Sequence, residues 1–488
     1  MELSLILIIV FMLTEDLWKG VGLSLSELKE RLTPKFDWDY AVSSVVRRKT
    51  TLDEMVKQNV VYAVHFPYLD EITNVPDITN KHKKRKLKKA TSPIALFVSV
   101  KTSEGKPYEL KPVAIQVDNF HDSPVYTPAD GRRWLLAKQL YQIADFAYVE
   151  MIEHLLKTHM VLQPICVTAK RTISVFHPLN ELLKWHCRGL ISTNVNGFPK
   201  LILPGNYMHL LFSMGHRGSI ELLNKGFLDL SWEDIDFWKS IKVAILTILL
   251  VIFKGRDDLR TISNVVIFQK RGVDDTEKLP YFPYRDDGYL IWQQIQNYVE
   301  EYVSLYYNED EDVSSDSELE NFTNELSVDG IGQFGGVGML RGFPSRIHTK
   351  TDLIQTLSRI LWLPIQHNAV NYPIAYYGAF VPNMPTKLYD DPRAKTDEYS
   401  FYTLPDRGVA TIQAVVSTSL GSLRFDNLLD YGAQMLDREA GELVEKHHKI
   451  LMTKVKAIIE KRNDKRFNDG HLTYPYLKPG WIPNSIHT

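Results

Sequence analysis

Two histidines five residues apart could bind one metal ion. His154 and His159 lie in a segment whose apolar residues repeat at helical spacing. On an ideal α-helix five residues turn by about 140° from one face, so the two rings would point in different directions. A π-helical turn, in which residues i and i+5 stack, would align them, and such turns occur mostly at functional sites. Two unrelated surface histidines remain the alternative.

A second pair, His367 and Asn371, has the spacing of four that places two side chains on one face of an undistorted helix. Imidazole nitrogens with an amide oxygen suit a first-row transition metal better than magnesium or calcium. The alternative is an asparagine that forms hydrogen bonds within its own helix. Taken alone, each pair is better explained without a metal ion. The case for a metal site therefore depends on the surrounding sequence.

Long helices must position these residues. Apolar residues recur every third and fourth position over 134–160, 353–365 and 428–462, which predicts helices with one buried face. Near the C-terminus Pro475, Pro479 and Pro483 exclude regular helix. The last residues are therefore predicted to run as irregular chain over, or into, a helical body.

The composition of the 488-residue chain is that of a soluble globular protein, with 44% hydrophobic and 24% charged residues. A net charge of −2 gives no field that would attract nucleic acid, so nucleic acid is not expected as a partner. Cys166 and Cys187 are too few for a disulfide scaffold and lack metal-finger spacing, so both are expected to be free core thiols.

Several stretches bear on membranes and location. The apolar runs 3–13 and 243–253 are too short to cross a bilayer. The first run lacks a basic segment before it and a clear cleavage site after it, so a cytoplasmic location is expected, with secretion as the alternative. The basic run 81–89 is expected to be a solvated loop, and contact with anionic lipid headgroups is the alternative.

Eight segments, in order, resemble the lipoxygenase family, and its animal-type members most. They are Trp134-Leu-Leu-Ala-Lys138, Glu150 with His154 and His159, His177-Pro-Leu through His186, Arg271-Gly-Val-Asp-Asp275, Tyr284-Arg-Asp-Asp-Gly-Tyr289, His367 through Asn371, Pro382-Asn-Met-Pro385 and Pro483-Asn-Ser-Ile486. The resemblance implies a mainly α protein with a lipoxygenase-like helical catalytic domain over 24–488, without the family's N-terminal β-sandwich. Residues 1–23 are then an atypical apolar N-terminus, signal-like or a gene-model artefact, and 243–269 an insertion or a retained intron.

The resemblance also implies the ligands of one non-haem iron, with manganese less expected. The ligands would be the side chains of His154, His159, His367 and Asn371 and the main-chain carboxylate of Thr488, where the family usually ends in Ile. His177 and His186 match family histidines outside this set and are expected to pack near the site.

A further departure lies close to the ligands. In many family members a Gln three residues after the ligand Asn forms a bridge to a Glu or Gln at the position of Glu150. Ile374 occupies the position of that Gln, so the bridge is not expected and the rate is in doubt.

The resemblance implies an oxidoreductase that forms oxylipins. An iron(III)–hydroxide would take a hydrogen atom from a C18 or C20 polyunsaturated fatty acid, such as linoleic or arachidonic acid, and O2 would add to give a hydroperoxide. Gly197 matches the position whose Gly or Ala tracks product handedness, which implies an R-type enzyme, and Leu201 matches the leucine that presses on the reactive pentadiene. The alternative for Gly197 is an ordinary turn glycine.

Two other functions remain open. A lipid hydroperoxide isomerase would use the same iron site to form epoxyalcohols, and a non-catalytic remnant would bind lipid without iron. The chain is expected to be a monomer with weak peripheral membrane contact at most, because the sequence has no room before residue 24 for the β-sandwich that docks family members on membranes.

Overall fold

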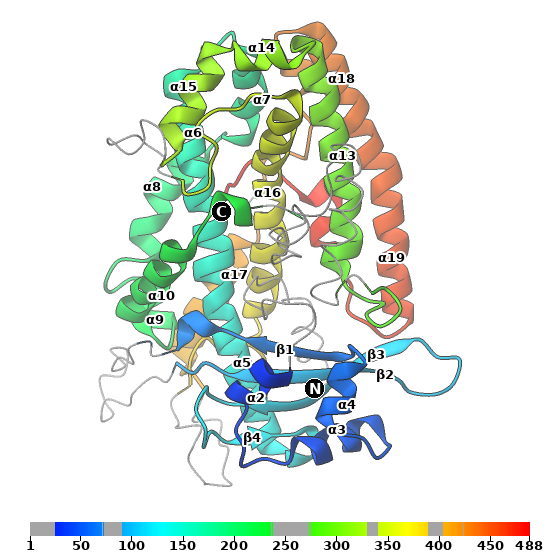
Figure 1. The fold of residues 1–488 in the computed structure, drawn as a ribbon. Helices are drawn as coiled ribbons and strands as arrows, with labels where there is room; N and C mark the ends of the chain where they lie inside the picture. Colours follow the sequence, from blue (N-terminus) through cyan, green and yellow to red (C-terminus); the bar gives the residue numbers. More distant parts are fainter. Residues whose placement is uncertain are drawn as a thin grey trace.

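A four-stranded antiparallel sheet lies at one end of the molecule in the computed structural model (Figure 1). Its strands pair in chain order as β1 (Val61–His65), β2 (Ile94–Lys101), β3 (Tyr108–Gln116) and β4 (Val125–Tyr126). The structure describes residues 25–70, 72, 90–235, 237, 273, 275–328, 340–388, 404–422 and 424–488. The basic run 81–89, the N-terminus 1–23 and the segment 243–269 lie outside the described residues, so the interpretations of them stay predictions.

Strand β2 is buried on both faces. One face, with Leu96 and Val98, packs into a cluster formed with the N-terminal helices α2 (Leu25–Arg31), α3 (Trp38–Val46) and α4 (Leu52–Lys57). The other face, with Ala95 and Phe97, packs into the main hydrophobic core, which the helical body shares. Two buried faces explain why this stretch is almost continuously apolar instead of alternating.

The rest of the described chain is mainly helical, which confirms the predicted fold class. Its helices are α5 (Arg132–Tyr148), the π-helix η3 (Val149–His159), α6 (Met160–Thr172), α7 (Pro178–His186), α8 (Leu190–Leu201), α9 (Tyr207–Leu211), α10 (Gly215–Asp229), α13 (Pro283–Tyr306), α14 (Asp310–Ser314), α15 (Ser317–Leu326), α16 (Lys350–Gly378), α17 (Arg407–Leu420), α18 (Arg438–Ile450), the π-helix η9 (Leu451–Val455) and α19 (Lys456–Asn468). Short 3₁₀ turns are η1 (Pro67–Leu69), η2 (Pro128–Asp130), η4 (Trp232–Asp234), η8 (Gly432–Gln434), η10 (Pro475–Leu477) and η11 (Pro479–Trp481).

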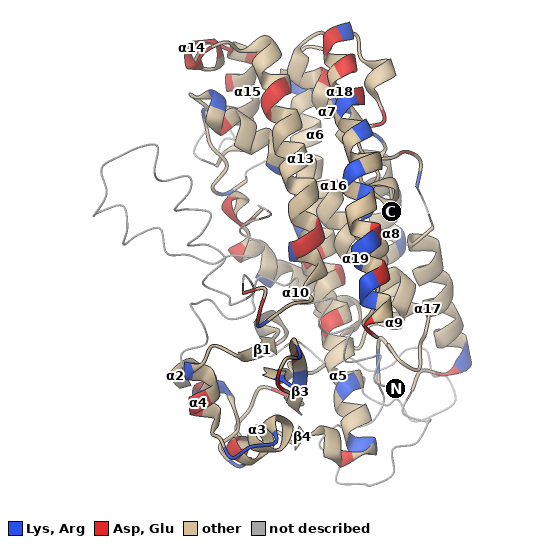
Figure 2. Cartoon of the chain, turned by 90° about the vertical axis from the view of Figure 1, so that its right-hand side faces the viewer, with Lys and Arg blue, Asp and Glu red and all other residues tan. Residues whose placement is uncertain are grey.

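Helix α16 runs through the middle of the helical body and packs against α13, α17 and η3. Most of its residues are buried, including every residue from Ile360 to Ala375. The outer helices carry the charge: red and blue alternate along α18 and α19 in Figure 2, while α16 is largely tan. Helices α5, η3 and α6 follow one another without a break and form a second long element beside α16.

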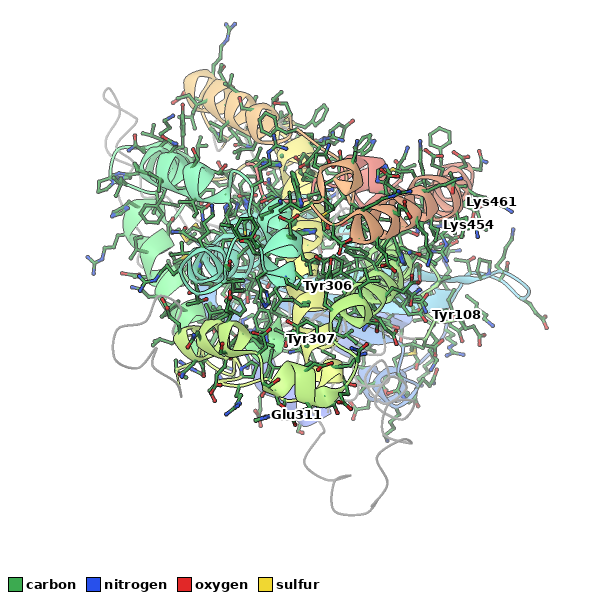
Figure 3. The ribbon with its side chains drawn as sticks, turned by 90° about the horizontal axis from the view of Figure 1, so that it is seen from above. Tyr108, Tyr306, Tyr307, Glu311, Lys454 and Lys461 are labelled. Carbon is green, nitrogen blue, oxygen red and sulfur yellow. A yellow bond between two sulfur atoms is a disulfide. The ribbon has the colours of Figure 1, made fainter. Side chains whose placement is uncertain are left out.

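A polar junction closes the end of the body that lies opposite the sheet. Figure 3 looks down on this end, where Tyr306 and Tyr307 lie at the end of α13. Asp316 caps α15 and also accepts hydrogen bonds from the Tyr307 hydroxyl at 2.6 Å and from His177 Nε2 at 3.1 Å. One carboxylate therefore ties together α7, α13 and α15.

The predicted helix over 428–462 has different ends in the structure. It begins only at Arg438, because the Asp437 side chain accepts from the first free N–H groups and caps the helix, and it continues to Asn468. Before it, Leu428, Leu429 and Tyr431 are buried in irregular chain instead. Among the described residues, no helix combines the length and apolarity needed to cross a bilayer.

The prediction of free cysteines is wrong. Cys166 of α6 and Cys187, directly after α7, form a disulfide. The connection between α6 and α7 reverses the chain, so residues 21 positions apart come within 5.6 Å between Cα atoms. Two cysteines in a long chain do not reveal this reversal, because it is set by how two helices pack.

Candidate metal centre

The π-helix η3 carries the first two candidate ligands. Its wider turn places residues five apart on one face, so the Nε2 atoms of His154 and His159 come within 3.0 Å of each other. Both side chains are buried, so the alternative of unrelated surface histidines is wrong. The spacing of five indicated this π-helical segment.

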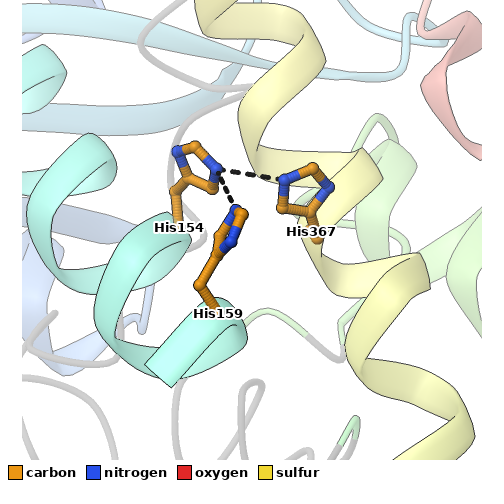
Figure 4. A group of neighbouring side chains, drawn as sticks. All are labelled: His154, His159 and His367. Atoms are coloured by element: carbon orange, nitrogen blue, oxygen red, sulfur yellow. Dashed lines mark hydrogen bonds between the residues drawn. The ribbon is translucent and has the colours of Figure 1, made fainter. Parts of the chain in front are cut away.

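His367 of α16 completes the group from the opposite side (Figure 4). Its Nε2 atom lies 3.0 Å from His154 Nε2 and 2.9 Å from the main-chain oxygen of Thr488. Within the described ranges, these three histidines are the one group of at least three His, Cys, Asp or Glu side chains whose ligand atoms lie within 4.8 Å of one another.

Hydrogen bonds on the far side of two rings fix their tautomers. The Glu150 carboxylate accepts from Nδ1 of His154 at 2.9 Å. Asn194 Oδ1 accepts from Nδ1 of His159 at 2.6 Å, because the Asn194 amide nitrogen is directed to Gln163. With the proton on Nδ1, each Nε2 atom carries a lone pair.

Two lone pairs 3.0 Å apart cannot hydrogen-bond to each other, and a cation between them removes the conflict. Burial, followed by the nearby His154, lowers the pKa of His159 to about 3. Burial also holds the pKa of His367 well below its usual value. The rings of His159 and His367 are thus neutral at ordinary pH, which is the form that binds a metal, and the donor set fits a first-row metal ion.

The chain end and Asn371 supply oxygen atoms beside the histidines. The turns η10 and η11 lead the C-terminal segment into the body, and residues 484–488 are all buried. This confirms the prediction that the tail runs into the helical body. Asn371 Nδ2 donates to Thr488 Oγ1 at 3.2 Å, while Asn371 Oδ1 is buried and has no hydrogen-bond partner in the described chain. A metal ion would satisfy this oxygen, so the asparagine also fits the predicted ligand set.

Glu150 has a different contact from the one the family pattern suggests. Ile374 is buried three residues after Asn371, so no amide is available there for a bridge. The Glu150 carboxylate instead orients His154. The two other family histidines lie outside the group: His177 caps α7, and His186 Nε2 contacts the Tyr431 hydroxyl at 3.1 Å.

Helix α8 borders the site with one face. Asn194, Gly197 and Leu201 are spaced by three and four, so they share a face, and Asn194 directs that face toward His159. Gly197 lies inside the helix, so the alternative of a turn glycine is wrong. The role of Asn194 was missed from the sequence, although its spacing to Gly197 and Leu201 was a usable signal.

The fold and the site define a mainly helical protein with a buried three-histidine centre suited to a metal ion. The sequence profile of the lipoxygenase family matches residues 41–233 and 271–423, so this chain belongs to the lipoxygenase family.

Individual relatives agree with this assignment. The chain is 26% identical over 470 residues to the allene oxide synthase-lipoxygenase protein of Plexaura homomalla, covering 91% of this chain and 40% of that protein. It is 29% identical over 421 residues to the linoleate 9/13-lipoxygenase of Pseudomonas aeruginosa, covering 82% and 55%. It is 27% identical over 389 residues to a hydroperoxide isomerase of Rattus norvegicus, covering 77% and 49%. The chain thus spans about half the length of these relatives.

The fold is similar to that of solved lipoxygenases. A coral 8R-lipoxygenase matches with a TM-score of 0.78 at 23% identity, over 100% of this chain and 66% of that one. A calcium-dependent 11R-lipoxygenase matches with a TM-score of 0.75 at 24% identity, over 92% and 61%.

Proposed function

We propose that this chain is a non-haem iron dioxygenase that adds O2 to a free C18 or C20 polyunsaturated fatty acid and releases a hydroperoxide. The observation that carries the proposal is the convergence of three buried imidazoles. The main-chain oxygen of Thr488 lies 2.9 Å from His367 Nε2, and Asn371, one helical turn after His367, has a buried amide oxygen without a hydrogen-bond partner in the described chain. Such a nitrogen and oxygen set suits iron, with manganese as the less favoured ion. The relative named a linoleate lipoxygenase supports this substrate class.

The chemistry that a bound iron ion supplies is one-electron exchange, which removal of a hydrogen atom from a bis-allylic carbon requires. Glu150 and Asn194 keep the proton on Nδ1 of His154 and His159, so the lone pairs point inward. Burial of these side chains keeps bulk water away from the site.

We propose that the inner face of α8 sets the position of oxygen addition. Leu201 would press on the pentadiene, and Gly197, which has no side chain, would leave room for O2 at one end of it. A Cβ atom at Gly197 would meet no described atom within 4 Å, which agrees with open space there. The product would then have R configuration.

A lipid hydroperoxide isomerase is the second candidate, because one relative bears that name at 27% identity. The two functions differ in what they consume. A dioxygenase takes up O2 with the fatty acid, whereas an isomerase rearranges a supplied hydroperoxide without O2.

The test is anaerobic metal analysis, followed by separate feeding of fatty acid and of fatty-acid hydroperoxide to the purified chain. We expect about one iron per chain and formation of a conjugated diene from fatty acid, with loss of both in His367→Ala. His348→Ala, which changes an exposed histidine, is the matched control. Turnover of hydroperoxide alone would favour the isomerase. Fatty-acid binding without iron would instead identify a non-catalytic lipid-binding protein.

We also propose weak peripheral contact with membranes through the α8–α9 face, defined as Val195, Phe198, Leu203 and Tyr207. These side chains are 63%, 39%, 43% and 39% exposed. Between Glu181 and Glu221 the sequence contains no carboxylate, while the exposed Lys200 lies within the face. An exposed apolar segment that carries a cation and no carboxylate of its own is complementary to an anionic bilayer.

Between the two locations considered, we propose an oxidising one outside the cytoplasm. The disulfide between Cys166 and Cys187 supports this choice, because the cytoplasm keeps thiols reduced. Mass spectrometry of unreduced peptides from the natural source would test it, and two free thiols would return the choice to the cytoplasm. We further propose that the chain acts as a monomer, which size-exclusion chromatography with light scattering would test.

A further inference from the structure

The side chain of the last residue lies between two consecutive residues of α16. Thr488 Oγ1 accepts a hydrogen bond from Asn371 Nδ2 at 3.2 Å. The Tyr372 hydroxyl is also hydrogen-bonded to the Thr488 side chain. All three residues are buried, so water does not replace these contacts.

The hydrogen bond to the hydroxyl fixes which end of the amide faces Thr488. A hydroxyl has one proton, and an amide can present either its NH2 group or its oxygen. Thr488 Oγ1 accepts from the NH2 group of Asn371, so its own proton stays available for the Tyr372 oxygen. In this arrangement the NH2 group of Asn371 faces Thr488, and Oδ1 faces the opposite way, where it has no hydrogen-bond partner in the described chain.

Tyr372 is itself held in place. The Arg424 guanidinium lies 5.4 Å from the centre of its ring and 4.6 Å from the Trp481 ring, in cation–π contact with both. The tyrosine can therefore act as a fixed partner for Thr488.

The Asn371 amide has no hydrogen-bonding partner at the position where the family often has a Gln. Ile374 stands three residues after Asn371 and offers no hydrogen-bonding group, so the amide cannot be held from that side. A ligand amide that could rotate freely would spend part of its time with NH2 toward the metal, and it would bind weakly.

We propose that Thr488 and Tyr372 are positioning residues that lock the Asn371 amide with its oxygen turned toward the metal site. This inference rests on the proposed metal-binding function. It assigns to the Thr488 side chain a task that is separate from its main-chain oxygen.

The test uses the full chain loaded with Co(II), which reports coordination through its visible absorption. Thr488→Val removes the hydroxyl at nearly constant shape, Thr488→Ser keeps it, and Tyr372→Phe removes its partner. Tyr377→Phe is the matched control, because Tyr377 lies on the same helix and its hydroxyl bonds Tyr476. Circular dichroism verifies that each variant is folded.

We expect Thr488→Val and Tyr372→Phe to bind Co(II) about 10-fold more weakly in chelator competition. Their visible absorption should be more intense, as expected when one ligand is lost. Thr488→Ser and Tyr377→Phe should match the parent in both measurements. Parent-like affinity and spectrum in folded Thr488→Val and Tyr372→Phe would overturn the inference and leave the proposed function intact. A parent chain that binds no metal would overturn both.

Discussion

Asn194 connects the metal site to helix α8 through one side chain. Its oxygen accepts from His159, and its nitrogen donates to Gln163. We expect Asn194→Ala to weaken iron binding by roughly 10-fold or more, because the His159 tautomer is no longer fixed. Chelator competition measures this. Asn196→Ala is the control, since Asn196 is exposed and bonds only to Ser192 in the described chain. Equal affinities in the two variants would show that Asn194 does not orient the ligand.

Gly197 permits a test in which stability and product separate. The residue is inside α8, and a methyl group there would meet no described atom within 4 Å. We expect Gly197→Ala to stabilise the chain by roughly 0.5–1 kcal/mol, because alanine is the better helix former. If the proposed oxygen position is correct, the product should become S at a shifted carbon.

A thermal melt and chiral chromatography measure the two effects of Gly197→Ala. Unchanged product with undiminished turnover would remove Gly197 from the site and the R assignment with it.

Sequence reasoning identified the residues that now meet but not the contacts that orient them. The spacing of His154 and His159 required a π-helical turn, and the turn is present. Asn194 was missed because its partner is 35 residues away, although its spacing to Gly197 and Leu201 placed it on their helix face. The Cys166–Cys187 pairing was missed for the same reason.

Among the helices, α8 is notable for how little of it is buried. Leu190 is its only fully buried residue within the described structure, and apolar side chains face outward. We expect the double variant Phe198→Ser, Leu203→Ser to bind anionic vesicles about 10-fold less, since two half-exposed apolar side chains no longer leave water. Phe176→Ser is the control, because Phe176 is 82% exposed in the α6–α7 connection.

Vesicle co-sedimentation measures this binding. An equal loss of vesicle binding in the control would show that nonspecific hydrophobic adsorption, not the α8–α9 face, causes the binding.

Elements were predictable to different degrees. Periodicity located the three long helices, but it did not reveal the cap at Asp437, because buried apolar residues continue before it in irregular chain. Strand β2 is a nearly continuous apolar stretch in the sequence, since burial on both faces removes the alternation that marks a strand. The helix cap and the strand were not predicted because both depend on how distant parts of the chain pack together.

For the whole molecule, Asp316 should make stability depend on pH. Burial acts to raise its pKa, but hydrogen bonds from His177, Leu319 and Tyr307 outweigh burial and lower the pKa to about 2. A carboxyl with a depressed pKa stabilises the fold above the unfolded value and loses this contribution as pH falls through about 2. The contribution is on the order of 2 kcal/mol at neutral pH.

We therefore expect Asp316→Asn to lower the free energy of unfolding by roughly 1–2 kcal/mol at pH 7 and by progressively less from pH 4 to 2. Urea unfolding across this range measures the difference. Asn can still cap α15, so helix loss is not the cause. A difference that stays constant with pH would show that the charge of Asp316 does not contribute.

The burial of residues 484–488 has a consequence for digestion from the carboxyl end. An exopeptidase must bind the last residue, which is inaccessible in the folded chain. Carboxypeptidase should therefore release Thr488 only from chains that have opened, and the rate of release should follow the open population. If the chain binds the proposed metal ion, chelation should accelerate the release, because the ion stabilises the closed chain. The rate at which this one amino acid is released would thus measure how often the folded chain opens.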